Sequence, residues 1–103
     1  MGLLSKLFGK VSVDFKQLKK DGAIVLDVRS NGEYKGGHIK DSLNIPLNEL
    51  AKQLNKFSKD KAIICVCASG IRSGSAKKIL SSHGFNQVHN GGSWKSLESK
   101  ITA

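Results

Sequence analysis

The sequence has few cysteines and prolines, the residues whose covalent structure restrains the chain of a small domain. It contains two cysteines in 103 residues, Cys65 and Cys67, and a single proline. Two cysteines are too few for the disulfide framework of a small secreted domain. Their C-x-C spacing also makes a bond between them geometrically unfavourable. We therefore expect reduced thiols and a cytoplasmic protein.

Long apolar runs and aromatic side chains are scarce as well. No segment approaches the roughly 20 apolar residues of a membrane-spanning helix, and the opening MGLLSKLFGK lacks the apolar core and cleavage site of a signal peptide. Aromatic residues make up 6% of the chain, too few for a base-stacking platform. We expect no nucleic-acid partner and no membrane span. Residues 1–9 are interpreted as a lead-in helix packing on the domain or, alternatively, as a short membrane-surface anchor.

Acidic residues are outnumbered, with eight Asp and Glu against 17 Lys and Arg and a formal net charge of +9. This balance favours anionic partners. Only Arg29 and Arg72 are arginines, however, and sequence-reading DNA sites rely heavily on arginine. The lysines are spread along the whole chain, so we interpret most of them as a solvated surface.

What remains is the composition of one ordinary globular domain, with 39% hydrophobic and 24% charged residues. Strand-like segments alternate with segments that carry apolar residues at helical spacing, such as Leu47, Leu50, Ala51 and Leu54. Strands are predicted over residues 11–13, 23–28, 42–45, 62–67 and 87–89. This order predicts an α/β fold, a single domain over residues 10–103 with a mostly parallel five-stranded sheet and helices on both faces.

Cys67 ends the most continuous apolar run, which we interpret as the central strand. Ligands of such sheets bind beyond the carboxyl ends of the strands. The small residues after Cys67 can curl their backbone N–H groups around an anion, and Gly70 supplies the necessary freedom. A helix beginning near Ser73 and the cation of Arg72 would both favour thiolate over thiol. The predicted anion cradle comprises Ala68, Ser69, Gly70, Ile71, Arg72 and Ser73.

Cys65 lies two residues earlier in the same strand, so its side chain should point to the same face, deeper in the core. We interpret it as a small buried hydrophobe, with a resolving thiol as the alternative. The two cysteines and three histidines match no common metal-ligand spacing, so no metal site is predicted.

Four stretches in this order resemble the rhodanese-like family over roughly residues 10–100. Cys67-x-x-Gly70-x-Arg72-Ser73 is similar to the family's active-site loop. The other three stretches are Leu26-Asp27-Val28-Arg29 with Glu33-Tyr34 and Gly37-His38-Ile39, then Asn44-Ile45-Pro46-Leu47, and finally Gly91-Gly92 with Trp94.

The resemblance implies a single-domain thiosulfate sulfurtransferase that needs no cofactor. Cys67 would attack the outer sulfur of a small anionic donor such as thiosulfate, release sulfite, and pass its persulfide sulfur to a thiol or cyanide. The loop residues would bind the donor. Because Ala68 and Ser69 are neutral, the loop offers less attraction to thiosulfate, and a protein persulfide is an alternative sulfur donor. A non-enzymatic sulfur carrier or protein-interaction module with the same fold is the alternative function, and a monomer is expected.

The same resemblance makes a phosphatase or arsenate reductase less favoured. Related folds with phosphatase activity have one more residue between the cysteine and the arginine, whereas Ala68 to Ile71 is the shorter form. Among the remaining polar residues we expect a structural ion-pair network of Asp27, Arg29 and Glu33. We interpret His38 as a hydrogen-bonded turn residue and Trp94 as a core or pocket-wall residue.

Overall fold

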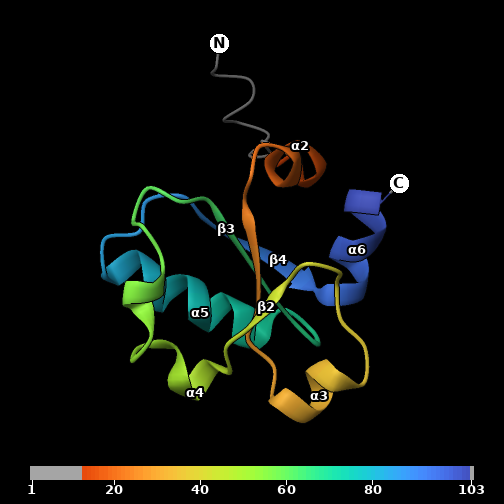
Figure 1. Cartoon of the computed structure of the whole chain (residues 1–103), viewed down its shortest axis with the longest axis horizontal. Coiled ribbons are helices and arrows are strands. Elements are labelled where there is room, and N and C mark those ends of the chain that lie inside the picture. The colour runs from red at the N-terminus through yellow and green to blue at the C-terminus, as the bar shows by residue number, and fades with distance from the viewer. Residues whose placement is uncertain (1–12, 103) are drawn as a thin grey trace, which may run out of the picture.

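The computed structural model describes residues 13–102. Its centre is a parallel sheet with the strand order β2-β1-β3-β4 (Figure 1). The strands are β1 (Ile24–Asp27), β2 (Leu43–Asn44), β3 (Ile63–Cys67) and β4 (Val88–Ser93). The prediction of an α/β fold around a parallel sheet is confirmed.

The predicted fifth strand is not present in the described part of the chain, whose sheet has four strands. Residues 11 and 12 of that predicted strand, like the predicted lead-in segment 1–9, lie outside the described residues. Val13 is described and is not in a strand. Its carbonyl accepts a hydrogen bond from the Phe15 N–H at 3.1 Å, so the backbone here turns into helix α2 (Phe15–Lys20) instead of pairing with a strand.

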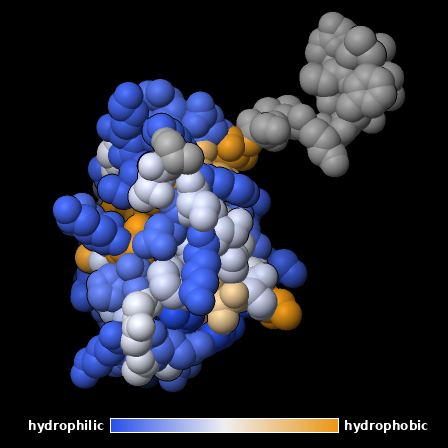
Figure 2. All heavy atoms as spheres, turned by 90° about the vertical axis from the view of Figure 1, so that its right-hand side faces the viewer, coloured by the Kyte–Doolittle hydropathy of each residue, from blue (hydrophilic) through white to orange (hydrophobic). Residues whose placement is uncertain are grey.

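Helices cover both faces of the sheet, as predicted. On one face lie α4 (Leu47–Leu50) and the longest helix, α5 (Ile71–Ser82), and on the other lie α2 and α6 (Trp94–Thr102) (Figure 1). The short α3 (Asn31–Lys35) and the 3-10 helix η1 (Leu54–Lys56) belong to connections. The face that carries α6 is largely hydrophilic (Figure 2), which agrees with lysines that serve as a solvated surface.

The apolar spacing from Leu47 to Leu54 predicts one helix, but the structure divides it. Beyond α4 the N–H of Lys52 donates to Glu49 and that of Gln53 donates to Leu50, at 3.1 and 2.9 Å. These i to i+3 bonds tighten the backbone, and the chain then enters η1. The apolar residues of this segment still face the core, because Leu50 is buried and Leu54 packs against the same core cluster.

Strand β3 is buried along its whole length and separates two core clusters. Its alternating side chains place Cys65 and Cys67 on the side of α5, packed with Leu26 of β1, while Ile64 and Val66 face α6. The prediction that both cysteines share one face is confirmed.

The carboxyl ends of β1 and β3 lie side by side and form the edge where the site is built. Asp27 pairs with Val66 in the register of the two strands, and the Val28 N–H donates to the Val66 carbonyl at 3.0 Å. Cys67 and the residues that follow β1 therefore meet at the same edge of the sheet.

Candidate active site

Cys67 is the last residue of β3, and its side chain is buried beneath the turn that leads into α5. Its Sγ accepts hydrogen bonds from the backbone N–H groups of Gly70 at 3.0 Å and Ser73 at 3.4 Å. The Ser73 hydroxyl lies 3.5 Å from the same sulfur. The loop therefore presents several hydrogen-bond donors to one sulfur atom, an arrangement that suits a thiolate.

Gly70 makes this curl possible. It precedes the first residue of α5 and has a φ of +103°, in the left-handed region that side-chain-bearing residues avoid. A Cβ at this position would lie 3.3 Å from Gly92 Cα in β4. Helix α5 begins at Ile71, two residues earlier than the sequence indicated. The whole stretch from Ile71 to Ser73 therefore belongs to its first turn, and the positive end of the helix dipole faces the loop.

The electrostatics of Cys67 follow from two opposing effects. Burial raises the pKa of the thiol, because a charged group is poorly solvated there. Hydrogen bonds from the Ser73 hydroxyl and from the N–H groups of Ser73, Ser69 and Gly70 outweigh burial and lower the pKa to about 7, from an ordinary value of 9.0. At neutral pH a large fraction of Cys67 is therefore thiolate, the nucleophilic form of cysteine.

Asn90 of β4 anchors this loop from the neighbouring strand. Its amide nitrogen donates to the Gly70 carbonyl at 3.0 Å, and its amide oxygen accepts from the Gly92 N–H at 2.9 Å. These two backbone groups fix the orientation of the amide, since one only accepts and the other only donates. The Ser73 hydroxyl donates to the same amide oxygen at 2.6 Å. Asn90 thus holds both the loop and the hydroxyl beside Cys67.

The single hydrogen of the Ser73 hydroxyl serves two neighbours. At 2.6 Å the oxygen of Asn90 is the nearer acceptor, and the sulfur of Cys67 lies at 3.5 Å. When the hydroxyl donates to Asn90, its oxygen is available to accept the S–H of a neutral Cys67. When Cys67 is charged, rotation of the hydroxyl hydrogen toward the sulfur stabilises the thiolate.

Arg72 differs from its expected role in one respect. Its guanidinium forms a bidentate ion pair with Glu33 of α3, with Nη1–Oε1 at 2.8 Å and Nη2–Oε2 at 3.0 Å. This hydrogen bond, assisted by the Ser30 backbone, lowers the pKa of Glu33 to about 2 and raises the pKa of Arg72. The Ser73 and Gly70 N–H groups, rather than Arg72, make the direct contacts to Cys67.

The expected network of Asp27, Arg29 and Glu33 is correct for the first two residues only. Arg29 and Asp27 form a buried ion pair at 2.7 Å, and Arg29 also donates to the Gly37 carbonyl at 2.7 Å. Glu33 offers Arg29 only its backbone carbonyl, at 3.4 Å. The hypothesis that the Glu33 carboxylate pairs with Arg29 is therefore wrong, because this carboxylate is held by Arg72.

Trp94 and His38 have structural surroundings. The Trp94 ring lies 4.8 Å from the guanidinium carbon of Arg29. It is partly buried and packs against the core cluster on the α6 side, at the edge of the core rather than within it. His38 bonds through Nδ1 to the Tyr34 carbonyl at 2.8 Å and stacks on the Tyr34 ring. This agrees with the interpretation of His38 as a hydrogen-bonded turn residue.

Cys65 is chemically unlike Cys67, although both are buried and unbridged. Burial raises the pKa of the Cys65 thiol to about 12, because it lies inside the core with no loop around it. It therefore stays protonated at neutral pH and packs as an apolar residue. Within residues 13–102 no group of three or more His, Cys, Asp or Glu side chains could hold a metal ion. No helix in this range is long and apolar enough to cross a membrane.

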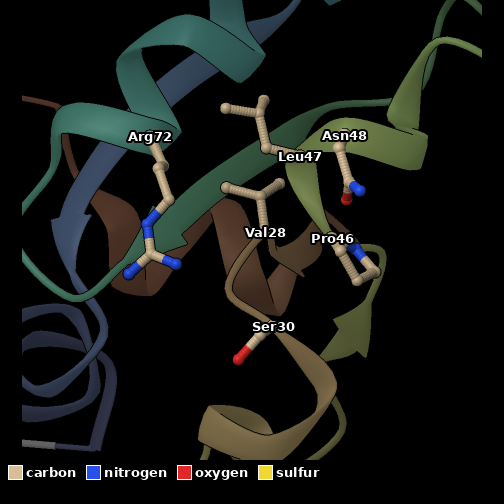
Figure 3. Close-up of a pocket in the computed structure, with 6 residues that line it drawn as sticks. All are labelled: Val28, Ser30, Pro46, Leu47, Asn48 and Arg72. Atoms are coloured by element: carbon tan, nitrogen blue, oxygen red, sulfur yellow. The ribbon is translucent and has the colours of Figure 1, made fainter.

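A pocket of about 340 Å³ opens at the same edge of the sheet. Arg72 comes to it from α5, Leu47 and Asn48 come from α4, and Val28 lies in the middle of the lining side chains (Figure 3). Ser30 and Pro46 complete the lining. The sequence pattern did not predict this pocket.

Of the six predicted cradle residues, Gly70 and Ser73 contact the sulfur of Cys67 directly, and Ser69 lowers its pKa through its backbone. The side chains of Ala68, Ser69 and Ile71 point away from the core, and Ile71 is 78% exposed. Asn90 and the pairing of Glu33 with Arg72 were missed. The only available signal was position: Asn90 immediately precedes the Gly91-Gly92 pair that approaches the loop.

The fold and the site define a class: a parallel α/β domain with a cysteine held in a loop of N–H donors at the end of its central strand. The model of the rhodanese-like domain matches residues 12–100. The chain therefore belongs to the rhodanese-like domain family, as its motifs indicated.

Three known proteins illustrate the relationship. The uncharacterized protein YqhL of Bacillus subtilis is 37% identical over 82 residues, which cover 79% of this chain and 65% of that protein. The thiosulfate sulfurtransferase PspE of Escherichia coli is 35% identical over 74 residues, covering 70% of this chain and 71% of that protein. A solved structure of a rhodanese with anions from Escherichia coli has a TM-score of 0.69 at 32% identity, covering 73% of this chain and 91% of that one. The chain thus spans slightly less than two thirds of YqhL.

Proposed function

We propose that this protein is a sulfurtransferase that carries sulfur as a persulfide on Cys67. The observation that carries the proposal is the lowered pKa of Cys67, about 7, inside a loop of hydrogen-bond donors. A thiolate is needed to attack sulfur, and a persulfide anion needs the same donors to stabilise its charge. The similarity to a thiosulfate sulfurtransferase and to a rhodanese solved with anions supports this assignment.

The reaction has two displacement steps at sulfur. The Cys67 thiolate attacks the outer sulfur of thiosulfate, a new S–S bond forms, and the S–S bond of the donor breaks, with its electron pair leaving on sulfite. An acceptor thiolate then attacks the outer sulfur of the persulfide. The bond to Cys67 Sγ breaks, its electron pair returns to Sγ as thiolate, and the acceptor leaves as its own persulfide. The net charge is unchanged in each step, and no metal or organic cofactor takes part.

Each loop residue has a role in this proposal. The N–H groups of Gly70 and Ser73 stabilise the Cys67 thiolate and the persulfide, and Asn90 positions them. The backbone of residues 68–73 binds the donor. Arg72 attracts an anionic donor, although the donor must compete with Glu33 for its guanidinium.

Intact mass spectrometry tests the proposal. After incubation with thiosulfate, the parent protein should gain one sulfur atom and the Cys67→Ser variant none. Addition of a small thiol should then remove this mass. If neither thiosulfate nor a persulfide donor, small or protein-bound, produces the adduct, the proposed function is wrong.

A protein persulfide as the donor is favoured by the surface around the loop. Ala68 and Ser69 are exposed and uncharged, Ile71 is 78% exposed, and the charge of Arg72 is compensated by Glu33. Such a surface suits docking of another protein better than capture of a small dianion. A persulfide that forms with a protein donor but only slowly with thiosulfate would identify the chain as a sulfur carrier.

A further inference from the structure

We propose that the pocket between α4 and α5 binds the carbon skeleton of the sulfur acceptor, a small organic thiol with an uncharged, partly aliphatic body. The inference rests on the proposed function, because it names the acceptor class for the Cys67 persulfide. Its evidence is separate: the shape, lining and charge of a pocket in which Cys67 itself takes no part.

The lining indicates an aliphatic ligand. Val28, Pro46 and Leu47 give the pocket an apolar wall, and their side chains lie around the same space (Figure 3). Thiosulfate and cyanide have no carbon chain to bury, so an apolar wall offers them nothing. A volume of about 340 Å³ lies at the lower end for ligand pockets, which restricts the ligand to a small molecule.

The polar rim indicates an uncharged ligand. Arg72 is the only charged residue of the lining, and Glu33 neutralises it with both carboxylate oxygens. The Ser30 hydroxyl is occupied by the same carboxylate at 3.0 Å. No residue of the described range 13–102 bonds to the exposed side-chain amide of Asn48, which leaves one neutral donor and acceptor for a hydroxyl or amide of the ligand.

The position suits the transfer step. Val28 packs in the same core cluster as Cys67 and donates its N–H to Val66, the residue before Cys67. The acceptor attacks the outer sulfur of the persulfide, one bond of about 2.05 Å beyond Sγ. Arg72 links the pocket to the loop, because it lines the pocket and also lies in the first turn of α5, directly after the Cys67 loop.

The experiment measures how fast an acceptor thiol removes the outer sulfur from a Cys67 persulfide formed beforehand. This step is called discharge below. An acceptor thiolate R–S⁻ attacks the outer sulfur, the S–S bond to Sγ breaks, and Cys67 thiolate and R–S–S⁻ result. We would measure this discharge by intact mass for 2-mercaptoethanol, 3-mercaptopropanol, 4-mercaptobutanol and 6-mercaptohexanol. Rates for the same thiols with a small-molecule persulfide correct for their intrinsic reactivity.

In the parent protein the corrected rate constant should rise about two- to fourfold per added methylene until the pocket is full, because each methylene leaves water. Leu47→Asn should flatten this dependence. Leu43→Asn is the matched control, since Leu43 is an exposed leucine outside the pocket, and it should keep the parent slope. Equal corrected rates for all four thiols, or equal slopes in the two variants, would overturn the proposal.

A second variant avoids the core. Asn48 is exposed, so Asn48→Asp should fold normally while adding a negative charge to the rim. In this variant the corrected rate constant should still rise with each added methylene. The rate constant for 2-mercaptoethanesulfonate should fall about two- to fivefold more than that for 3-mercaptopropanol. Equal slowing of both thiols would contradict a ligand held at this rim.

Binding can be tested without any sulfur transfer. The S-methyl thioether of 6-mercaptohexanol, added to the Cys67→Ser variant, should shift the NMR signals of the Val28 and Leu47 methyl groups and leave those of Leu43 unchanged. If the parent never forms a persulfide but these shifts appear, the proposed function fails, and with it the role as acceptor site, while the binding of an aliphatic ligand in the pocket stands. If a persulfide forms but no shift and no length dependence appear, the acceptor pocket is wrong and the sulfurtransferase stands.

Discussion

Arg72 and Glu33 bind each other through both ends of their charged groups, at 2.8 and 3.0 Å. The pair joins α5, which follows the Cys67 loop, to α3, which follows β1. It neutralises the arginine nearest in sequence to the candidate nucleophile. An anionic sulfur donor therefore meets a cation that already has a partner.

Glu33→Gln should release Arg72 for an anionic donor. Glutamine can keep the hydrogen bond to the Ser30 N–H that caps α3, so the fold should persist. The KM for thiosulfate should fall about two- to fivefold with little change in kcat, the range set by exposed ion pairs. Steady-state kinetics at low and high salt check this, and salt should reduce the difference.

Glu49→Gln is the matched control, because Glu49 is exposed on α4 and pairs with no arginine or lysine in the described residues. It should leave the KM unchanged. An unchanged KM in Glu33→Gln would mean that Arg72 does not contact the donor.

The ionisation of Cys67 can be measured directly. The ultraviolet absorbance of its thiolate, with the Cys67→Ser variant as the blank, should titrate with a midpoint at about pH 7. The thiolate is the form above this pH, so persulfide formation should accelerate as the pH rises through 7 and then level off. Cys65, whose pKa is raised to about 12, should add no absorbance change in that range.

Ser73→Ala should move the same midpoint upward, toward the ordinary value of 9.0, because burial remains while the hydroxyl that stabilises the thiolate is lost. Ser75→Ala is the control, since Ser75 is exposed on the same helix. A midpoint that stays in place in Ser73→Ala would show that the backbone N–H groups alone set the ionisation.

Two glycines should respond to alanine with opposite signs. Gly70→Ala forces a side chain into φ +103° and to within 3.3 Å of Gly92 Cα, which should cost about 1–3 kcal/mol of unfolding free energy. A Cβ on Gly32 meets nothing within 4 Å, and Gly32 lies inside α3. Gly32→Ala should therefore stabilise by up to about 1 kcal/mol. Urea unfolding gives both values, and equal effects would contradict strain at Gly70.

The buried pair of Asp27 and Arg29 should be required for folding rather than for chemistry. Asp27→Asn leaves the Arg29 guanidinium buried without a counter-charge, which should cost about 3–5 kcal/mol. Asp60→Asn, at an exposed carboxylate, should change the unfolding free energy by less than about 0.5 kcal/mol. Residual sulfur transfer per folded molecule should be the same in both variants, and a selective loss in Asp27→Asn would point to a direct role.

The sequence was informative where one local pattern determines the structure. The apolar run ending at Cys67 predicted the central strand, and the small residues after it predicted the curled loop. Gly70 was expected to supply the backbone freedom for this curl, and the structure gives it a φ of +103°. Alternation along the strand placed both cysteines on one face, with only one of them in the loop.

The sequence was least informative where partners are far apart along the chain. Glu33 lies four residues after Arg29, and this proximity suggested an ion pair that the fold does not make. Arg72 is 39 residues away from Glu33 and is its actual partner. The contact of Asn90 with Ser73 likewise depends on the register of β4 with β3, which shifts by one residue beyond Cys65. No local pattern encodes such a register shift.

The sulfur of Cys67 is held mainly by main-chain N–H groups, and these are the same for any residue except proline. The side chains of Ala68, Ser69 and Ile71 face outward and are not needed to hold it. The backbone of the loop therefore determines the reactivity of Cys67, whereas its outward-facing side chains determine which partner is recognised. Substitutions at these three positions can redirect the protein to a different partner while the nucleophile stays intact, which makes this short loop a natural place to engineer new specificity.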